Sequence, residues 1–89
     1  MSLELLKSND KGKTYQADGF KILYRRTGSV SGDNHLNPTE QIFLVSGTAA
    51  VTIGGETRTY ESPAEIHIPA QTYHKIEAIT DFTAVLCTA

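Results

Sequence analysis

The sequence has few of the features that mark secreted or membrane proteins. Its 89 residues include one cysteine, Cys87, and no tryptophan. A single cysteine cannot form an internal disulfide, which fits a reducing compartment. No apolar run approaches the roughly 20 residues that a membrane-spanning helix needs, and the N-terminus lacks the charged and apolar regions of a signal peptide. We therefore expect a cytoplasmic protein with no membrane partner.

An excess of basic residues is also missing. The chain has 8 Lys and Arg against 10 Asp and Glu, which gives a formal net charge of −2. Nucleic-acid-binding domains usually carry a basic patch or stripe. Here the charged residues are scattered singly or in pairs such as Arg25-Arg26. The sequence therefore predicts no nucleic-acid partner and no attraction to an anionic membrane.

The length favours a single domain over residues 1–89. A domain of this size buries only about 60–70% of its unfolded-chain surface, so sealing a sheet edge against a second copy would add stability. Helical periodicity is scarce beyond the N-terminus, where "LELLK" fits either a short helix or a first strand. The remaining sequence alternates short β-type runs with turn residues.

These runs predict an all-β fold. Strands are expected at 20–26, 40–45, 48–53, 57–60, 65–68, 73–79 and 82–88, with a turn cluster at 27–32. Gly54-Gly55 predicts a two-residue hairpin of type I′, which needs positive φ at both central residues. Short strands separated by frequent turn signals are typical of a sandwich or barrel.

Polar residues with metal-ligand chemistry precede the strand at 40–45. Asp33 and His35 are two apart and share a side in extended backbone. Glu40 is five residues beyond His35, an odd separation, but a turn at Asn37-Pro38-Thr39 can reset the register and bring the two together. Glu40 then shares a face with the aliphatic residues two and four positions on, which is costly for a carboxylate unless it is paired, hydrogen-bonded or ligating.

A second histidine cluster lies in "EIHIPAQTYHKI". His74 opens a late strand, and if that strand neighbours the Glu40 strand, His74 completes a set of two imidazoles and one carboxylate. This is the ligand set of facial-triad sites for Fe(II) and related divalent metals, and adding Asp33 also suits Mn, Ni or Zn. The spacing alone does not show that residues 35 and 74 are adjacent.

Each candidate also has an ordinary structural interpretation. Asp33 lies in a Gly-Asp-Asn stretch, where Asp commonly makes local hydrogen bonds in turns. His35 and Glu40 could form a polar pair at the mouth of the barrel, and His74 could be exposed at the start of its strand. His67 alternates with two isoleucines: it faces solvent or a subunit interface if they are core residues, and is a candidate acid or base if it points inward.

The spacing of these residues resembles that of the small single-domain cupins. Their first motif, G-x5-H-x-H-x(3,4)-E-x6-G, is matched at His35, Glu40 and Gly47, with Asp33 in place of the first histidine. Their second motif, G-x5-P-x-G-x2-H-x3-N, is matched at two positions and differs at three. The residues at these five positions are Pro69 and His74, which match, and Pro63, Gln71 and Ala78, which differ.

The resemblance covers roughly residues 20 to 88. It implies a double-stranded β-helix (the cupin jelly-roll barrel), commonly a homodimer, often with one divalent metal inside. The implied ligands are His35, Glu40 and His74, with Asp33 at the fourth position. Fe, Mn, Ni and Zn all stay open as the metal, and the resemblance implies no particular catalytic residue.

Two functional classes remain open. The first is a metal-dependent enzyme acting on a small molecule, for which the resemblance allows dioxygenase, isomerase or lyase activity. The second is a non-catalytic small-molecule-binding or sensor protein with a structural metal or none. The sequence shows no evident substrate-anchoring residue such as an inward arginine, which keeps the second class open. A barrel that binds no ligand is a third possibility.

Overall fold

The computed structural model describes residues 3–33 and 38–88, and only the backbone is described at Asp33 and Thr88. These residues form ten β-strands and no helix, which confirms the all-β prediction. In chain order the strands are β1 (Glu4–Asn9), β2 (Gly12–Ala17), β3 (Phe20–Arg25), β4 (Val30–Asp33), β5 (Glu40–Ser46), β6 (Thr48–Ile53), β7 (Glu56–Glu61), β8 (Ala64–Ile68), β9 (His74–Ala78) and β10 (Phe82–Thr88).

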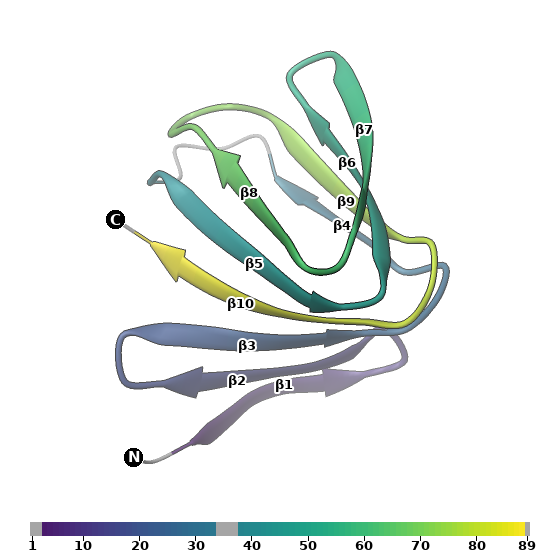
Figure 1. The fold of residues 1–89 in the computed structure, drawn as a ribbon. Helices are drawn as coiled ribbons and strands as arrows, with labels where there is room; N and C mark the ends of the chain where they lie inside the picture. Colours follow the sequence, from purple (N-terminus) through teal and green to yellow (C-terminus); the bar gives the residue numbers. More distant parts are fainter. Residues whose placement is uncertain (1–2, 34–37, 89) are drawn as a thin grey trace.

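The strands form two antiparallel sheets that face each other (Figure 1). The larger sheet has the order β1-β2-β3-β10-β5-β8, and the smaller sheet has the order β4-β9-β6-β7. The first three strands extend the larger sheet at the bottom of the view. Strands distant in sequence thereby become neighbours, such as β3 and β10, and the inward side chains of both sheets share one interior.

Inward residues alternate with outward ones along each central strand, as expected for a sheet with one buried face. In β5, Ile42 and Leu44 are 4% and 2% exposed, while Phe43 between them is 37% exposed. Glu40 shares the inward face with these two aliphatic residues, as the sequence predicted. The core is formed by Leu23, Ile42, Leu44, Ala49, Val51, Ile66, Ile68, Ala78, Phe82 and Ala84.

Near the N-terminus the structure decides one open alternative and corrects the prediction at two places. Of the two interpretations of "LELLK", the first strand is confirmed, because most of this stretch lies in β1, whereas β2 is a strand that the sequence did not predict. The stretch 27–32, predicted as a turn cluster, turns only in its first part and then forms most of β4. Gly32 is not a chain breaker here: a Cβ at this position would lie 2.6 Å from the carbonyl oxygen of His74, so glycine lets β4 approach β9 closely.

The hairpin at Gly54-Gly55 is confirmed, with Ile53 and Glu56 paired at its ends. The predicted type I′ turn is wrong, because only Gly54, at 63°, has a positive φ. A positive φ at the first central residue alone is the pattern of a type II′ turn. Within the described residues, no helix is long and apolar enough to cross a membrane.

Candidate metal centre

Glu40 and His74 face each other inside the molecule. Nε2 of His74 lies 3.5 Å from Oε1 of Glu40, and the two side chains are 10% and 15% exposed respectively. The sequence expected this contact if their strands were neighbours. That condition is wrong, since β5 belongs to the larger sheet and β9 to the smaller one. The residues meet because both begin their strands with an inward side chain at the same end of two facing sheets.

Backbone pairing holds each residue of this pair in position. Glu40 lies opposite Ile68 of β8, which is 1% exposed. His74 lies opposite Ile53 of β6 on one side and opposite Asp33 of β4 on the other. The strands that carry the pair are therefore hydrogen-bonded on both sides, and rigid strands are good supports for a site that needs fixed geometry.

The second ring nitrogen of His74 indicates its tautomer. Nδ1 lies 3.3 Å from the carbonyl oxygen of Thr72, and a carbonyl can only accept a hydrogen bond. Nδ1 therefore carries the proton in this contact, which leaves Nε2 to face Glu40. If Nε2 holds a lone pair, two acceptors face each other and a cation between them removes the repulsion. A proton on Nε2 would do the same by forming an ion pair.

The spacing of the pair fits a shared metal ion. Imidazole nitrogen and carboxylate oxygen bind divalent transition metals at about 2.0–2.2 Å. Two such donors at the tetrahedral angle are about 3.4 Å apart, close to the 3.5 Å observed. A hydrogen bond from the other ring nitrogen to a carbonyl is also the usual support of a metal-bound histidine. The donor chemistry and the spacing of Glu40 and His74 therefore fit a divalent metal.

The other two predicted ligands cannot be placed at the pair. His35 lies outside the described residues, and at Asp33 only the backbone is described, opposite His74. Among the side chains that the structure describes, no group of three His, Cys, Asp or Glu residues is arranged to hold a metal. The four-residue ligand set therefore stays a prediction, and Glu40 with His74 is the part whose geometry is seen.

The pair lines a cavity of about 430 Å³ between the two sheets. Aliphatic side chains form much of its wall, and Thr14 and Ser31 add hydroxyl groups. Three basic residues also line it: Lys7, Lys21 and Arg25. No inward arginine was evident in the sequence, but Arg25 lines the cavity.

The alternation of residues along β3 could have indicated that these basic residues line the cavity. Lys21, Leu23 and Arg25 alternate, so they share one face. The opposite face carries Phe20, Ile22 and Tyr24 and looks more apolar, which suggests the wrong side as the interior. Leu23, at 9% exposure, is the residue that is buried. Its two basic neighbours therefore border the cavity.

Comparison with solved structures identifies the architecture. An RmlC-like cupin from Shewanella frigidimarina matches with a TM-score of 0.80 at 12% identity, over 97% of this chain and 82% of that one. The capsular polysaccharide assembling protein CapF of Staphylococcus aureus matches with a TM-score of 0.80 at 18% identity, over 98% of this chain and 28% of CapF. The chain has the cupin fold. This confirms the predicted jelly-roll barrel.

A third cupin-fold neighbour is an enzyme. Salicylate 1,2-dioxygenase from Pseudoaminobacter salicylatoxidans matches with a TM-score of 0.68 at 18% identity, over 85% of this chain and 19% of that one. The present chain thus spans less than a third of the dioxygenase and of CapF. No family model matches the sequence, and no curated protein matches it. These likenesses establish the fold and leave the activity open.

The remaining histidine of the chain, His67, lies outside the interior of the barrel. Ile66 and Ile68 beside it are 2% and 1% exposed, whereas His67 is exposed and its Nδ1 lies 3.4 Å from Oε1 of Gln41. The alternative in which His67 points inward as an acid or base is therefore wrong. Its outward position makes it a useful comparison for His74.

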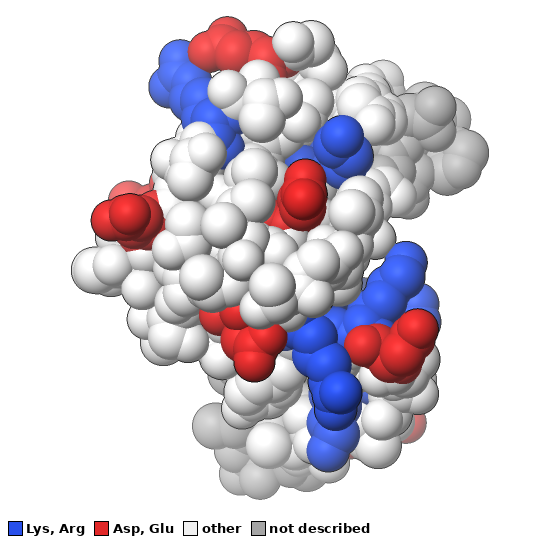
Figure 2. Space-filling view, turned by 90° about the vertical axis from the view of Figure 1, so that its right-hand side faces the viewer, with Lys and Arg blue, Asp and Glu red and all other residues white. Residues whose placement is uncertain are grey.

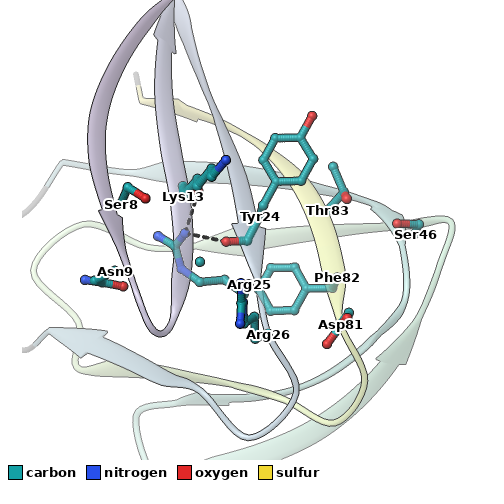
Figure 3. A pocket seen from close by; sticks show the side chains of 11 residues that line it. Ser8, Asn9, Lys13, Tyr24, Arg25, Arg26, Ser46, Asp81, Phe82 and Thr83 are labelled. Carbon is teal, nitrogen blue, oxygen red and sulfur yellow. Dashed lines mark hydrogen bonds between the residues drawn. The ribbon is translucent and has the colours of Figure 1, made fainter.

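A second pocket of the barrel, of about 360 Å³, lies at the β1–β2 turn and contains none of the predicted ligands (Figure 3). Asp81 at its edge accepts hydrogen bonds of 2.8 Å from the amide and the hydroxyl of Thr27. The carboxylate of Asp81 therefore already accepts two hydrogen bonds from the turn that contains Thr27. Among the described residues, the cavity at Glu40 and His74 is the better candidate for chemistry.

Proposed function

We propose that this protein binds one divalent metal inside its barrel and uses the adjoining cavity to bind or transform a small molecule. The observation that carries the proposal is the approach of Glu40 and His74 across the two sheets, at a distance suited to a shared ion. The cavity beside them provides room for a ligand. A volume of a few hundred cubic ångströms is usual for small-molecule sites.

In this proposal Glu40 and His74 are joined as ligands by His35 and Asp33, the other two residues of the predicted set. Mixed nitrogen and oxygen ligands suit Fe, Mn, Ni or Zn. When bound, such a metal would supply a Lewis acid or an oxygen-activating centre. An enzymatic role is supported by the dioxygenase among the cupin-fold neighbours, and isomerase or lyase activity is equally compatible with the fold.

A non-catalytic binding or sensor protein is the second candidate. It is favoured by the composition of the cavity wall. Beyond Glu40 and His74, the described lining residues offer aliphatic, hydroxyl and cationic contacts but no second carboxylate or histidine. CapF, also solved with the inhibitor 3-isopropenyl-tropolone, shows that a neighbour accepts a small organic molecule.

A titration with Mn(II) tests the proposal and separates the two candidates. Metal-free protein should remove the electron paramagnetic resonance signal of free Mn(II) until about one equivalent is bound, and Glu40→Gln should weaken this binding. Bound Mn(II) that accelerates the relaxation of water protons has an open coordination position, which favours catalysis. Bound Mn(II) without this effect favours a structural metal. Free Mn(II) that persists in excess protein contradicts the proposal.

We also propose that the protein is a homodimer formed through the outer face of the larger sheet. One line of apolar side chains runs across five strands in register: Leu5, Tyr15, Ile22, Val85 and Phe43. Leu5 and Phe43 at its ends are 52% and 37% exposed. An exposed apolar patch of this extent is characteristic of an interaction surface.

A second copy of the chain is the occupant that suits this surface. The line of apolar residues lies on a sheet face, and two identical faces can meet around a two-fold axis with each residue row covered by its counterpart. Further exposed apolar residues flank the line, with Tyr24 at 44% and Val45 at 57% exposure. Covering this face would also compensate for the thin core of an 89-residue chain.

A further inference from the structure

The cavity beside Glu40 and His74 is unbalanced in charge. Its described lining includes three cationic residues, Lys7, Lys21 and Arg25, and one carboxylate, Glu40, which already faces His74. The exterior differs: the face shown in Figure 2 carries basic and acidic side chains side by side in its lower half, at the level of β1 to β3. Basic residues also gather at the second pocket, where Lys13, Arg25 and Arg26 lie beside Asp81. The cavity between the sheets differs in that Lys21 lines it together with the Glu40–His74 pair.

Arg25 is held in position without a carboxylate. Its Nη1 donates to the carbonyl oxygens of Lys13 and Tyr24 at 2.9 and 3.0 Å, drawn as dashed lines in Figure 3, and Nη2 donates to Oγ1 of Thr14 at 2.9 Å. A guanidinium has five N–H donors. Two therefore lack a partner among the described groups, and the head is fixed before any ligand arrives.

Burial makes this arrangement costly for the protein alone. It lowers the pKa of the Arg25 guanidinium, because partial removal from water disfavours the charged form. Among the described residues, no carboxylate forms an ion pair with Arg25 to offset that cost. A ligand with a negative charge would do so, and charge-assisted hydrogen bonds from arginine to a carboxylate are among the strongest available.

Lys21 lies on the same wall, closer to the proposed metal. It pairs with Leu86 of β10, which pairs in turn with Ile42 of β5, two residues after Glu40. Two strand spacings, about 10 Å, thus separate the backbone of Lys21 from that of Ile42. Leu23, Ile42 and Leu86 line the same cavity and give its wall an apolar surface.

We infer that the cavity takes a small organic carboxylate, whose charged group is held by Lys21 and Arg25 and whose apolar body lies on Leu23, Ile42 and Leu86. The body of the ligand then extends toward Glu40 and His74. This inference rests on the proposed function only in that it uses the same cavity. Lys21 and Arg25 are anchoring residues in this account and take no part in metal binding.

The test uses benzoate as the probe and benzamide as its neutral counterpart, with binding followed by two-dimensional NMR on metal-free protein. Benzoate should bind about tenfold more tightly than benzamide, as expected when one charge-assisted interaction is lost. Lys21→Met and Arg25→Gln should each reduce benzoate affinity by about fivefold or more. Arg25→Lys should restore part of the loss, and the shifted signals should include Leu23 and Ile42.

Lys13→Met is the matched control, because Lys13 is an exposed lysine of the neighbouring strand that does not line this cavity. It should leave benzoate affinity unchanged. The inference is overturned if wild-type protein binds benzoate and benzamide alike or binds neither. It is also overturned if Lys21→Met leaves the preference intact, or if inorganic phosphate binds more tightly than benzoate.

The metal-free state keeps this test separate from the proposed function. A preference for benzoate in protein that never takes up metal would support the carboxylate site and contradict the metal site. Metal uptake without any preference for benzoate would do the reverse. Metal content measured on Lys21→Met should equal that of the wild type.

Discussion

At the scale of single residues, the direction of a side chain decides whether it can take part in chemistry. His67 lies between two isoleucines within β8, whereas His74 is the first residue of β9 and is followed by Lys75. His74 points inward to within 3.5 Å of Glu40, whereas His67 points to the surface. Alternation left two directions open for His67, and the burial of Ile66 and Ile68 decides for the outward one. The partner of His74 depended on the packing of the two sheets, which alternation does not specify.

Asp81 provides a prediction at this scale. Hydrogen bonds from the amide and then the hydroxyl of Thr27 lower the pKa of the Asp81 carboxyl. Thr27→Val removes only the hydroxyl bond, so we expect the pKa of Asp81 to rise part of the way toward its ordinary value. Carbon-detected NMR of the carboxyl during a pH titration measures this. An unchanged pKa in the variant would contradict the assignment.

The same shift fixes the sign of a pH effect on stability. Because the folded-state pKa is lowered, the ionised carboxyl stabilises the fold at neutral pH, and this contribution is lost as the pH falls from the unfolded value, about 3.9, through the folded one. Asp81→Asn should therefore be less stable than wild type at neutral pH. The difference should shrink in acid.

At the scale of elements, strand existence was predictable and some pairings were not. The runs at 40–45, 48–53 and 82–88 combine apolar and β-branched residues with clear turn residues at their ends, and each forms a strand. β2 has only one apolar aromatic residue, Tyr15, among polar ones, so it lacks a periodic signal. β4 is rich in residues that also favour turns, and it is a strand because β9 supplies its hydrogen-bond partners.

The candidate site, like the set of strands, was predictable only in part. Residue type and spacing selected Glu40 and His74, because a carboxylate on an apolar strand face calls for a partner. The basic residues of the cavity were not predicted. Lys21 and Arg25 lie on the less apolar face of β3, and the more apolar face is the one that the sequence suggests as buried. Only the packing of β3 beside β10 shows which side is inward.

Gly32 yields a prediction for the contact between β4 and β9. A methyl group there would lie 2.6 Å from the carbonyl oxygen of His74 and 3.1 Å from Cα of Lys75, both backbone atoms that cannot move without disturbing the sheet. Gly32→Ala should therefore lower the free energy of unfolding by about 2 kcal/mol or more. Urea denaturation measures the loss.

The control for this substitution is Gly55→Ala. A Cβ on Gly55 has no heavy atom within 4 Å, and its φ lies outside the left-handed region. The free energy of unfolding should change by less than about 0.5 kcal/mol. Equal losses for the two variants would show that the close approach of β4 to β9 is not what makes Gly32 necessary.

At the scale of the whole molecule, the barrel has a line of apolar residues on the outer face of its larger sheet and basic residues in the wall of the cavity between its sheets. The apolar line across the larger sheet predicts a dimer. Phe43→Lys places a charge in that line at an exposed position, so it should shift the protein toward the monomer without unfolding it. Light scattering coupled to size-exclusion chromatography measures the mass of the species.

Thr59→Lys is the matched control, since Thr59 is exposed on β7 at the edge of the smaller sheet. This variant should keep the mass of the wild type. A wild type that is monomeric at high concentration would contradict the proposed interface. So would a dimer that both variants retain.

The central claim is that Glu40 and His74 form part of a metal site, and metal content tests it most directly. Wild-type protein is incubated with Fe(II), Mn, Ni or Zn, freed of unbound metal and measured by elemental analysis. The account predicts about one equivalent per chain in wild type and in His67→Ala, and little or none in His74→Ala. Wild type that stays free of every metal, or His74→Ala that retains a full equivalent, would contradict it.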